Sequence, residues 1–577
     1  MPGKQILDSW KEICAYLQRS EKTCRKWERE LGLPIHRMDE SPSARVFAYK
    51  DELDRWREST QHSEKKTFFR KSIVKKILIP SIAITFLLVI AVLIWWPWSD
   101  AASGPSKPSI VILPFEDLSP QKDQEYFCDG MTEEIISRLS NIEGLKVPAR
   151  TSSFWFKGKG LDLPAIAERL GVENVLEGTV RQAGEKIRIT VQMVNVPDGT
   201  SIWSEKFDWD QEDIFILQDE ISMAIVDKLK VSLLGGDEER ITKNYTKNLK
   251  AYNLYLRGRY CAHSLTREGL NTSIRFYRQA LEEDPHYALA YSGLADAYCS
   301  LSYLNCMEPK QAFPKAEAAV SKALELDDML AEAHLSLATI LVHYYWDWEG
   351  AEKEYRLALD LNPNYALAHA VYAYDYLLTT GRHEEALREA KRAQELDPLS
   401  PLIIDSLGSL YRRLKQYDKA IETFQSILEI EPNYISAKAN LASVYELIGD
   451  YDKSTKLSAE ALKFYGVDER FLKTVQLELA KFGYKASVQK GLEIFDDYHE
   501  PGTMRYKDRA GYYAIIDKKD EAFEWLEKAY EKREGGLIHV KNSVYFENLH
   551  SDPRFESLLK RMNLDKYWTK PSNTHKK

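Results

Sequence analysis

Four side chains near the start of the chain have the types and spacing that bind phosphate groups. Lys22, Thr23, Arg25 and Lys26 fall in residues 21–31, whose pattern predicts a helix. Positions i, i+3 and i+4 share one helix face, so the three cations point the same way. Ammonium and guanidinium groups in this arrangement contact phosphate oxygens and base edges of nucleic acids.

The surrounding residues predict a compact helical element with a hairpin. A capping box at Ser9 starts a first helix, Ser20 caps the second, and Gly32 ends it. Residues 34–37 and 45–49 flank the polar stretch DESPSA, which is typical of a β-hairpin. Residues 51–57 predict a third helix. Together these elements make a winged helix-turn-helix.

This segment also resembles a known family. DSWKEICAYLQRSEKTCRKWERELGLPIHR, followed by RVFAYKDELDRW, resembles the MerR/excisionase-like DNA-binding head. The resemblance implies a domain over residues 1–60 whose second helix enters the major groove, with Arg37 and Arg45 on a phosphate-contacting wing. Residues 1–60 hold 12 basic and 11 acidic residues, so a solvated helix face and a protein-binding module stay open as alternatives.

Residues 77–96 read ILIPSIAITFLLVIAVLIWW and contain no charge. This length fits the ~20 residues of a transmembrane helix. A basic juxtamembrane segment, residues 61–76, precedes it, and a linker with one lysine, residues 97–108, follows it. The positive-inside bias predicts a single-pass protein of the bacterial inner membrane, with a cytoplasmic N-terminus and a periplasmic C-terminal region. A signal peptide and a buried soluble helix are the alternatives.

Charge and cysteine usage narrow the function classes. Residues 1–76 carry 18 Lys and Arg against 12 Asp and Glu, whereas the whole chain has a net charge of −9. The basic end suits a nucleic acid or an anionic lipid, and the acidic remainder argues against polyanion binding there. The six cysteines form no CxxC, so no metal site is expected. Cys299 and Cys306 either pair or are small buried residues.

Residues 109–236 show the order βαβαβββα, with a short strand at 145–148, a helix over 163–170 that ends at Gly171, and a strand over 186–195. This order predicts a mixed α/β layer. The motifs VILPFEDLS, ARTSSFWFKG and SEKFDWDQEDIFILQDEI resemble the TolB amino-terminal-like domain. That resemblance implies no catalytic residues. The stretch Lys157-Gly158-Lys159-Gly160 lacks the P-loop frame, and no GxSxG or HExxH occurs. We therefore expect neither a cofactor nor an enzyme.

From residue 250 the chain repeats. Pro or Asp recurs at 328, 363, 398 and 432, at intervals of 35, 35 and 34 residues. With small residues such as Gly408 and Ala420 at helix-packing positions, residues 250–466 resemble the tetratricopeptide-repeat (TPR) family. Residues 467–570 predict a degenerate repeat and a helical cap.

Arrays of this type bind peptides or partner helices on a concave face. The positions expected there, the predicted groove residues, are Asp296, Thr339, Tyr374, Asp405, Ser409, Arg412, Ser443 and Glu446. They are mostly neutral or acidic, which disfavours a carboxylate clamp. A simple spacer is the alternative.

The predicted fold class is multidomain: a small winged helix-turn-helix, one transmembrane helix, a mixed α/β TolB-like domain and an all-α TPR solenoid. The predicted function is a membrane-anchored one-component transcriptional regulator. Its expected partners are DNA, the membrane, a protein or peptide in the groove, and a second copy in a homodimer. An envelope interaction scaffold with a vestigial head is the alternative.

Overall fold

The structure is a computed structural model that describes residues 5–38, 45–58, 107–183, 186–210, 214–231, 233, 237–464, 469–498 and 504–568. The chain divides into two compact units, Met1–Ser106 and Lys107–Lys577.

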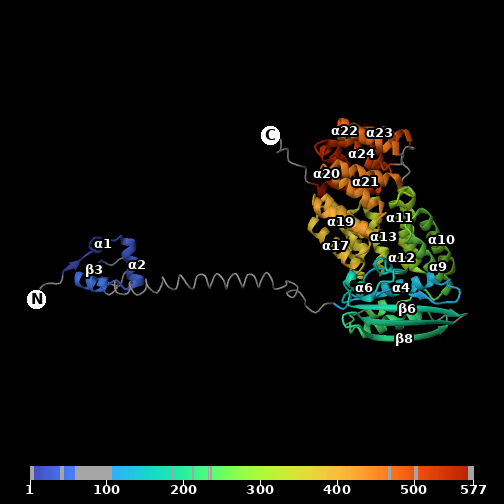
Figure 1. The fold of residues 1–577 in the computed structure, drawn as a ribbon, viewed down its shortest axis with the longest axis horizontal. Helices are drawn as coiled ribbons and strands as arrows, with labels where there is room; N and C mark the ends of the chain where they lie inside the picture. The colour runs from blue at the N-terminus through green and yellow to red at the C-terminus, as the bar shows by residue number, and fades with distance from the viewer. Residues whose placement is uncertain are drawn as a thin grey trace. The chain divides into compact units, whose positions relative to one another are not determined.

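The first unit contains a three-stranded antiparallel sheet and short helices (Figure 1). Its elements are β1 (Ile6–Leu7), α1 (Trp10–Leu17), α2 (Glu21–Leu31), β2 (His36–Arg37), β3 (Val46–Tyr49) and helical residues 50–58. The hydroxyls of Ser9 and Ser20 accept hydrogen bonds from the amides of Glu12 and Thr23, which explains both helix starts. Ile13, Leu17, Cys24 and Leu53 form the core of this unit.

The second unit begins with a five-stranded sheet of order β4-β6-β7-β8, with β5 also paired to β6. Its elements are β4 (Ile110–Ile112), β5 (Glu116–Asp117), α4 (Glu125–Ser140), α5 (Arg150–Phe154), α6 (Leu163–Leu170), β6 (Asn174–Ala183), β7 (Lys186–Asn195), β8 (Thr200–Asp210), α7 (Ile214–Lys228) and α8 (Asp237–Ile241). β4 runs parallel to β6, and β6, β7 and β8 are antiparallel. Alternate β7 side chains, from Ile187 to Met193, are buried, so one face of the sheet is apolar.

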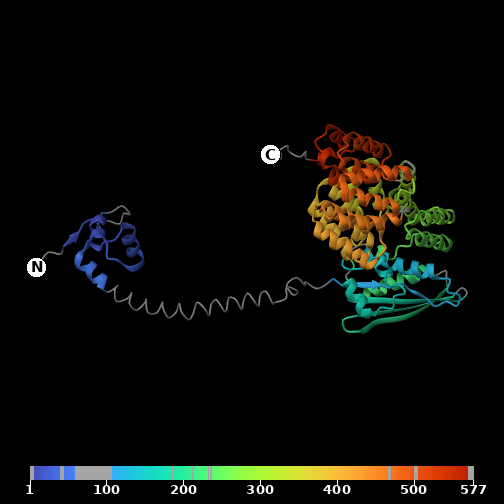
Figure 2. The ribbon, with the colours of Figure 1, turned by 45° about the horizontal axis from the view of Figure 1, so that its top comes forward.

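Helices α4 and α6 lie between this sheet and the repeat helices in both ribbon views (Figures 1 and 2). The repeats comprise α9 (Leu249–Ala262), α10 (Arg267–Glu283), α11 (Ala288–Tyr303), α12 (Pro309–Leu326), α13 (Ala331–Ile340), α14 (Trp348–Leu361), α15 (Ala366–Val371), α16 (Leu378–Thr380), α17 (His383–Leu396), α18 (Pro401–Arg413), α19 (Tyr417–Ile430), α20 (Ile435–Leu447) and α21 (Tyr451–Phe464). Two π-helical segments, η2 (Leu341–Tyr345) and η3 (Tyr372–Leu377), continue α13 and α15. π-Turns widen a helix locally and often mark functional positions.

The C-terminal region packs back onto the array. It comprises α22 (Glu469–Phe482), α23 (Tyr484–Tyr498), α24 (Tyr506–Ile515), α25 (Lys519–Glu531), η4 (Gly535–Asn542), η5 (Val544–Leu549), α26 (Pro553–Arg561) and η6 (Asp565–Tyr567). One hydrophobic core includes Val342, Tyr376 and Leu441 of the repeats together with Leu537 and Phe546. The C-terminal region therefore shares a hydrophobic core with the array.

Two predictions require correction. The part of the chain that the structure describes contains no helix long and apolar enough to cross a bilayer. Its longest helix, α12, has 18 residues and carries charged side chains from Lys310 to Glu325, which a bilayer core disfavours. Residues 77–96 lie outside the described residues. The fold class with a transmembrane helix and the inner-membrane location are not supported, and the fold is instead a mostly helical TPR-like solenoid with some sheet.

Cys299 and Cys306 are both free thiols, with Cys299 buried. The open alternative from the sequence is thereby decided in favour of small, unpaired residues.

Candidate functional site

The predicted DNA-binding residues lie on the surface of the first unit. Lys22, Arg25 and Lys26 are exposed along α2, and the Thr23 hydroxyl lies 2.9 Å from the Ser20 hydroxyl. Arg25 pairs with Glu21 at 2.8 Å and Lys26 with Glu30 at 3.7 Å, each one helical turn away. The helix therefore presents a row of cations that is partly balanced by its own carboxylates.

The two predicted wing residues differ in how firmly they are held. Arg37 binds Glu28 at 2.6 Å, and the Glu28 side chain is only 18% exposed. Arg45 binds Asp8 at 2.7 Å across a more open surface, where its side chain is 67% exposed. Arg37 thus ties the wing to α2, whereas Arg45 is freer to contact another molecule.

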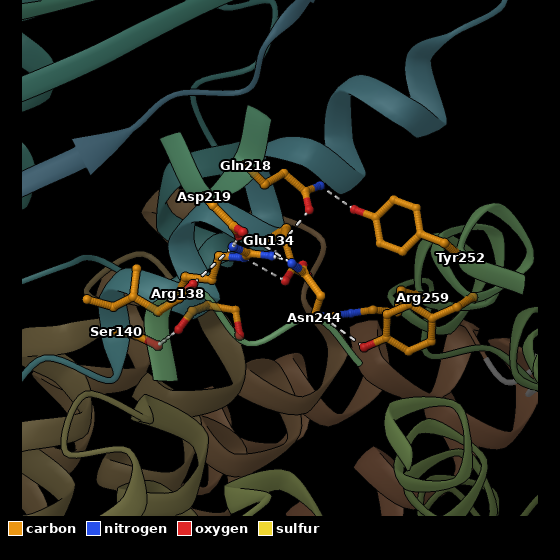
Figure 3. Close-up of polar contacts among 11 residues, drawn as sticks. Glu134, Arg138, Ser140, Gln218, Asp219, Asn244, Tyr252 and Arg259 are labelled. Atoms are coloured by element: carbon orange, nitrogen blue, oxygen red, sulfur yellow. Dashed lines mark hydrogen bonds and ion pairs between the residues drawn. The ribbon is translucent and has the colours of Figure 1, made fainter. Parts of the chain in front are cut away.

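Buried ion pairs of Arg138 join α4 to α7 inside the α/β region, and its hydrogen bonds reach the segment that leads to the first repeat. Arg138 of α4 is 4% exposed and donates to Glu134 at 3.0 Å, to the Ile241 carbonyl at 2.9 Å and to Asn244 at 2.8 Å. Figure 3 shows Arg138 between Glu134 and Asp219, and an ion pair joins it to Asp219 as well. A buried guanidinium with this many acceptors has its charge compensated, so its burial is not an uncompensated cost to the fold.

Glu133, the neighbour of Glu134, bridges directly to the repeats. It pairs with Arg259 of α9, with His263 at 3.0 Å and with Arg150 at 3.4 Å. Although burial acts to raise its pKa, the charges of Arg259 and His263 hold the pKa of the Glu133 carboxyl well below its usual range. Glu133 lies in the middle of α4, which begins at Glu125, and its side chain is buried.

A second contact joins the α/β region to the middle of the array. The Asn364 amide donates to the carbonyls of Ser140 and Leu145 at 2.9 and 3.0 Å. Asp397 accepts from the Ser152 amide at 2.9 Å, and burial raises the pKa of Asp397 to about 6. Asn364 and Asp397 are next to Pro363 and Pro398, two of the periodic prolines. The turns between repeats therefore provide the hydrogen bonds to the α/β region.

The predicted groove residues separate into two groups. The Asp296 side chain on α11 reaches solvent, but the protein atoms packed around its carboxyl partly desolvate it and raise its pKa to about 6. Thr339 lies on α13, and its hydroxyl donates to the Leu335 carbonyl of its own helix at 2.9 Å. Near this part of the groove Tyr303 is 55% exposed.

The other predicted groove residues lie under the C-terminal region or bond one another. Arg412 donates to the Ser443 hydroxyl at 2.8 Å, and that hydroxyl lies 2.5 Å from the Tyr545 hydroxyl of η5. The Tyr374 ring lies 4.5 Å from the His539 ring, between centroids. Glu446 is hydrogen-bonded to Tyr484 of α23, Asp405 accepts from Asn440 at 3.0 Å, and Ser409 is buried. This half of the predicted groove is filled by the chain itself.

A buried cluster that the sequence did not reveal fastens η4 to the array. Asp375 of η3 accepts from His343 of η2 at 2.9 Å and from His539 of η4 at 3.4 Å. The other His343 ring nitrogen donates to the Gly535 carbonyl at 3.2 Å. Two donated bonds require the imidazolium form, and the Asp375 charge raises the pKa of His343 despite burial. These residues are too far apart in sequence to form a motif.

Comparison with known proteins supports part of the predicted identity. Residues 106–224 match the family described as HilA/YgeH-like transcriptional regulator, second domain, and residues 404–434 match a tetratricopeptide repeat. The region expected to be TolB-like is therefore HilA/YgeH-like, and the repeats are confirmed. The membrane and homodimer predictions are not supported by these comparisons.

Relatives match over part of their length. Transcriptional regulator HilA of Salmonella paratyphi A is 22% identical over 304 residues, 52% of this chain and 53% of HilA. A protein of Rhizobium meliloti named putative adenylate cyclase 3 is 37% identical over 239 residues, 41% of this chain and 40% of that protein. The chain thus spans about half or less of the lengths of these relatives. The structure of PilF from Pseudomonas aeruginosa is 25% identical over 37% of this chain and 96% of that chain, with a TM-score of 0.28.

The prediction that the chain is not an enzyme needs correction. The name of the Rhizobium meliloti relative includes a cyclase activity, so relatedness to a protein named as an enzyme is a finding that the sequence motifs did not anticipate.

Proposed function

We propose that this protein is a transcriptional regulator whose first unit binds DNA and whose repeat array receives a protein or peptide partner. The observation that carries the proposal is the match of residues 106–224 to the second domain of HilA/YgeH-like transcriptional regulators. The exposed cations of α2 and the tetratricopeptide repeats support the two binding roles.

The α2 cations are available to phosphates although several are paired. Exposed ion pairs contribute about 0–1 kcal/mol, so a DNA phosphate can replace Glu21 beside Arg25 at little cost. Among the described residues Lys22 has no ion pair, and its ammonium is free to bind first. Arg25 also lies over the Trp10 ring at 4.9 Å, which holds its guanidinium beside the first residue of α1.

DNA binding is tested with the full chain in fluorescence anisotropy against a genomic fragment library, over a range of salt. We expect affinity to fall steeply with salt, and Lys22→Ala to reduce the salt slope by about 1. Arg25→Ala should weaken binding as well. Arg55→Ala is the matched control, because Arg55 is exposed and pairs with Asp51 at 3.1 Å on a different helix.

Absence of salt-dependent binding to every fragment contradicts the DNA-binding role. An equal loss in the Arg25 and Arg55 variants contradicts the assignment of α2 as the contacting helix.

The partner site is proposed at the open part of the concave face. Asp296 and Tyr303 lie on the same face of α11, and both side chains are accessible to solvent. A peptide display selection on the full chain tests this assignment. Asp296→Asn and Tyr303→Ala should weaken the selected peptides at least tenfold, and Ser443→Ala should not, because Ser443 is already engaged by Tyr545. If Ser443→Ala weakened peptide binding and the Asp296 and Tyr303 variants did not, the partner would bind at the half of the groove that the C-terminal region covers.

A further inference from the structure

A small cavity of about 140 Å³ lies where the C-terminal region meets the repeats. Its walls come from α16–α17, from the end of α18, and from η4–η5. Organic ligands of ordinary size occupy sites of ~300 Å³ or more, so this cavity fits only a very small molecule or a single functional group.

The charge on the cavity wall is unbalanced. Arg413, Lys415 and Lys541 line it, and Glu547 is the only carboxylate among its lining residues. Glu547 is already paired with Lys415 at 2.8 Å. Within the described residues, Arg413 donates to the neutral Tyr374 hydroxyl at 3.1 Å and Lys541 to the Tyr567 carbonyl, and neither has an ion pair.

Lys541 gives the strongest indication of an anion site among these cations, because it is only 8% exposed. Burial lowers its pKa to about 8, and no carboxylate offsets that effect. Two histidines complete the wall. The pKa of His383 is lowered by burial and by the Lys541 charge, and the buried Nε2 atom of His550 has no hydrogen-bond partner. Buried cations without a counter-charge are costly, and an anion in the cavity would relieve that cost.

We propose that this cavity is a binding site for a phosphate-type oxyanion, either inorganic phosphate or the phosphate group of a small phosphomonoester. Arg413 and Lys541 supply the charge, and Asn542 and Ser543 are uncharged polar residues on the same wall. Because Arg413 belongs to the repeats and Lys541 to η4, the bound anion joins the C-terminal region to the array. The site is independent of the proposed DNA and peptide interfaces.

The test is calorimetric titration of the full chain with inorganic phosphate and, separately, with glycerol phosphate, in chloride buffer of matched ionic strength. We expect saturable phosphate binding that Arg413→Gln and Lys541→Met each weaken at least tenfold. Glu547→Gln should strengthen it several-fold, because the only lining carboxylate is removed. Lys532→Gln is the control, since Lys532 pairs with Glu308 away from the cavity.

The Glu547 variant keeps the test decisive if Lys541→Met does not fold, because the Glu547 side chain is half-exposed and its replacement adds no buried group. Binding of phosphate but not its ester supports the site with free phosphate as its ligand, and binding of both supports a cavity open to esters. No saturable binding of either anion, or binding unchanged in the Glu547 and Arg413 variants, overturns the proposal.

Discussion

The predicted groove residues of the repeat array fall into an open half and a covered half, which differ in what lies against them. On α11 the Asp296 and Tyr303 side chains face solvent. On α18 and α20 the equivalent surface meets Tyr484 and Tyr545 of the C-terminal region. Repeats with one sequence signature thus provide an accessible surface in one half and an internal packing surface in the other. The difference shows that a repeat pattern defines the scaffold but not which part of the groove can receive a partner.

The largest expected effect comes from the buried carboxylate at the covered half. Asp375→Ala leaves the His343 imidazolium buried without its partner, which should lower the free energy of unfolding by about 3–5 kcal/mol. Urea denaturation measures the loss. Asp296→Ala is the matched change in the open half.

Asp296 should behave in the opposite sense to Asp375. Because its folded-state pKa is raised to about 6, its ionised form at pH 7 opposes folding, and its removal should leave stability unchanged or slightly higher. Similar losses for the two variants would remove the distinction between the halves.

The helix packing beneath the concave face should be equally tight in both halves. A Cβ atom at Gly258 of α9 would lie 2.5 Å from the Tyr277 ring, and one at Gly408 of α18 would lie 2.6 Å from the Phe424 ring. Alanine at either site should cost about 1–3 kcal/mol by overpacking, measured by thermal unfolding. Gly491→Ala is the control, since its nearest neighbour is at 3.8 Å. A marked difference between Gly258 and Gly408 would mean that the halves also differ in their scaffold.

The histidines around Asp375 should give the covered half a distinctive pH dependence. Burial, with the Arg413 charge, lowers the pKa of His539 to about 3, whereas the pKa of His343 is raised. Between pH 6.5 and 3 the unfolded chain binds a proton that His539 in the folded chain does not, so the free energy of unfolding falls by about 1.4 kcal/mol for each unit by which the pH is lowered. The His343 contribution is complete below pH 6.5 and is lost as the pH rises through its folded pKa.

Unfolding curves of His539→Gln and His343→Gln across pH 4.5–8.5 separate the contributions of the two histidines to the pH dependence of stability. The His539 variant should lose the decline below pH 6.5, and the His343 variant should lose the decline above it. Lys507 also contributes to the field at His539, so its charge must be retained in both variants. Curves parallel to the wild type would contradict the opposite titration of the two rings.

The smallest expected difference concerns single hydroxyl groups. Tyr545→Phe removes the bond to Ser443 and should cost about 0.5–1.5 kcal/mol. Tyr303→Phe should change the free energy of unfolding by less than about 0.5 kcal/mol, because its side chain is exposed. Equal values from chemical denaturation would indicate that Tyr303 is also engaged.

Local patterns predicted the elements of the α/β region well. The alternation in residues 186–195 predicted a strand, and β7 has those bounds. Asp162 caps α6 and Gly171 ends it in the left-handed region, as the predicted helix over 163–170 requires. By contrast, the predicted strand at 145–148 appears only as the bridge from Ser109 to Lys146. Its backbone partner lies far from it in sequence, and local pattern does not encode that pairing.

A candidate site could be predicted from the sequence only where all of its residues belong to one helix or strand. The α2 cations are neighbours along a helix, so their shared face follows from helical spacing. The contacts of Glu133 with Arg259 and of His343 with Gly535 join residues 126 and 192 positions apart. No short motif connects them, and the covering of Ser443 by Tyr545 could not be inferred for the same reason. Accessibility of the groove is a tertiary property that the repeat signature leaves open.

The position of η4 and η5 in the chain has a consequence during synthesis. Because these segments follow all of the repeats, the apolar lining around Val342 and Leu441 has no cover until the last part of the chain leaves the ribosome. A partly made chain therefore exposes this apolar surface while the residues from the end of α21 to the end of η5 are translated. Premature termination before Gly535 should yield a species that chaperones bind and proteases remove, although every repeat in it is intact.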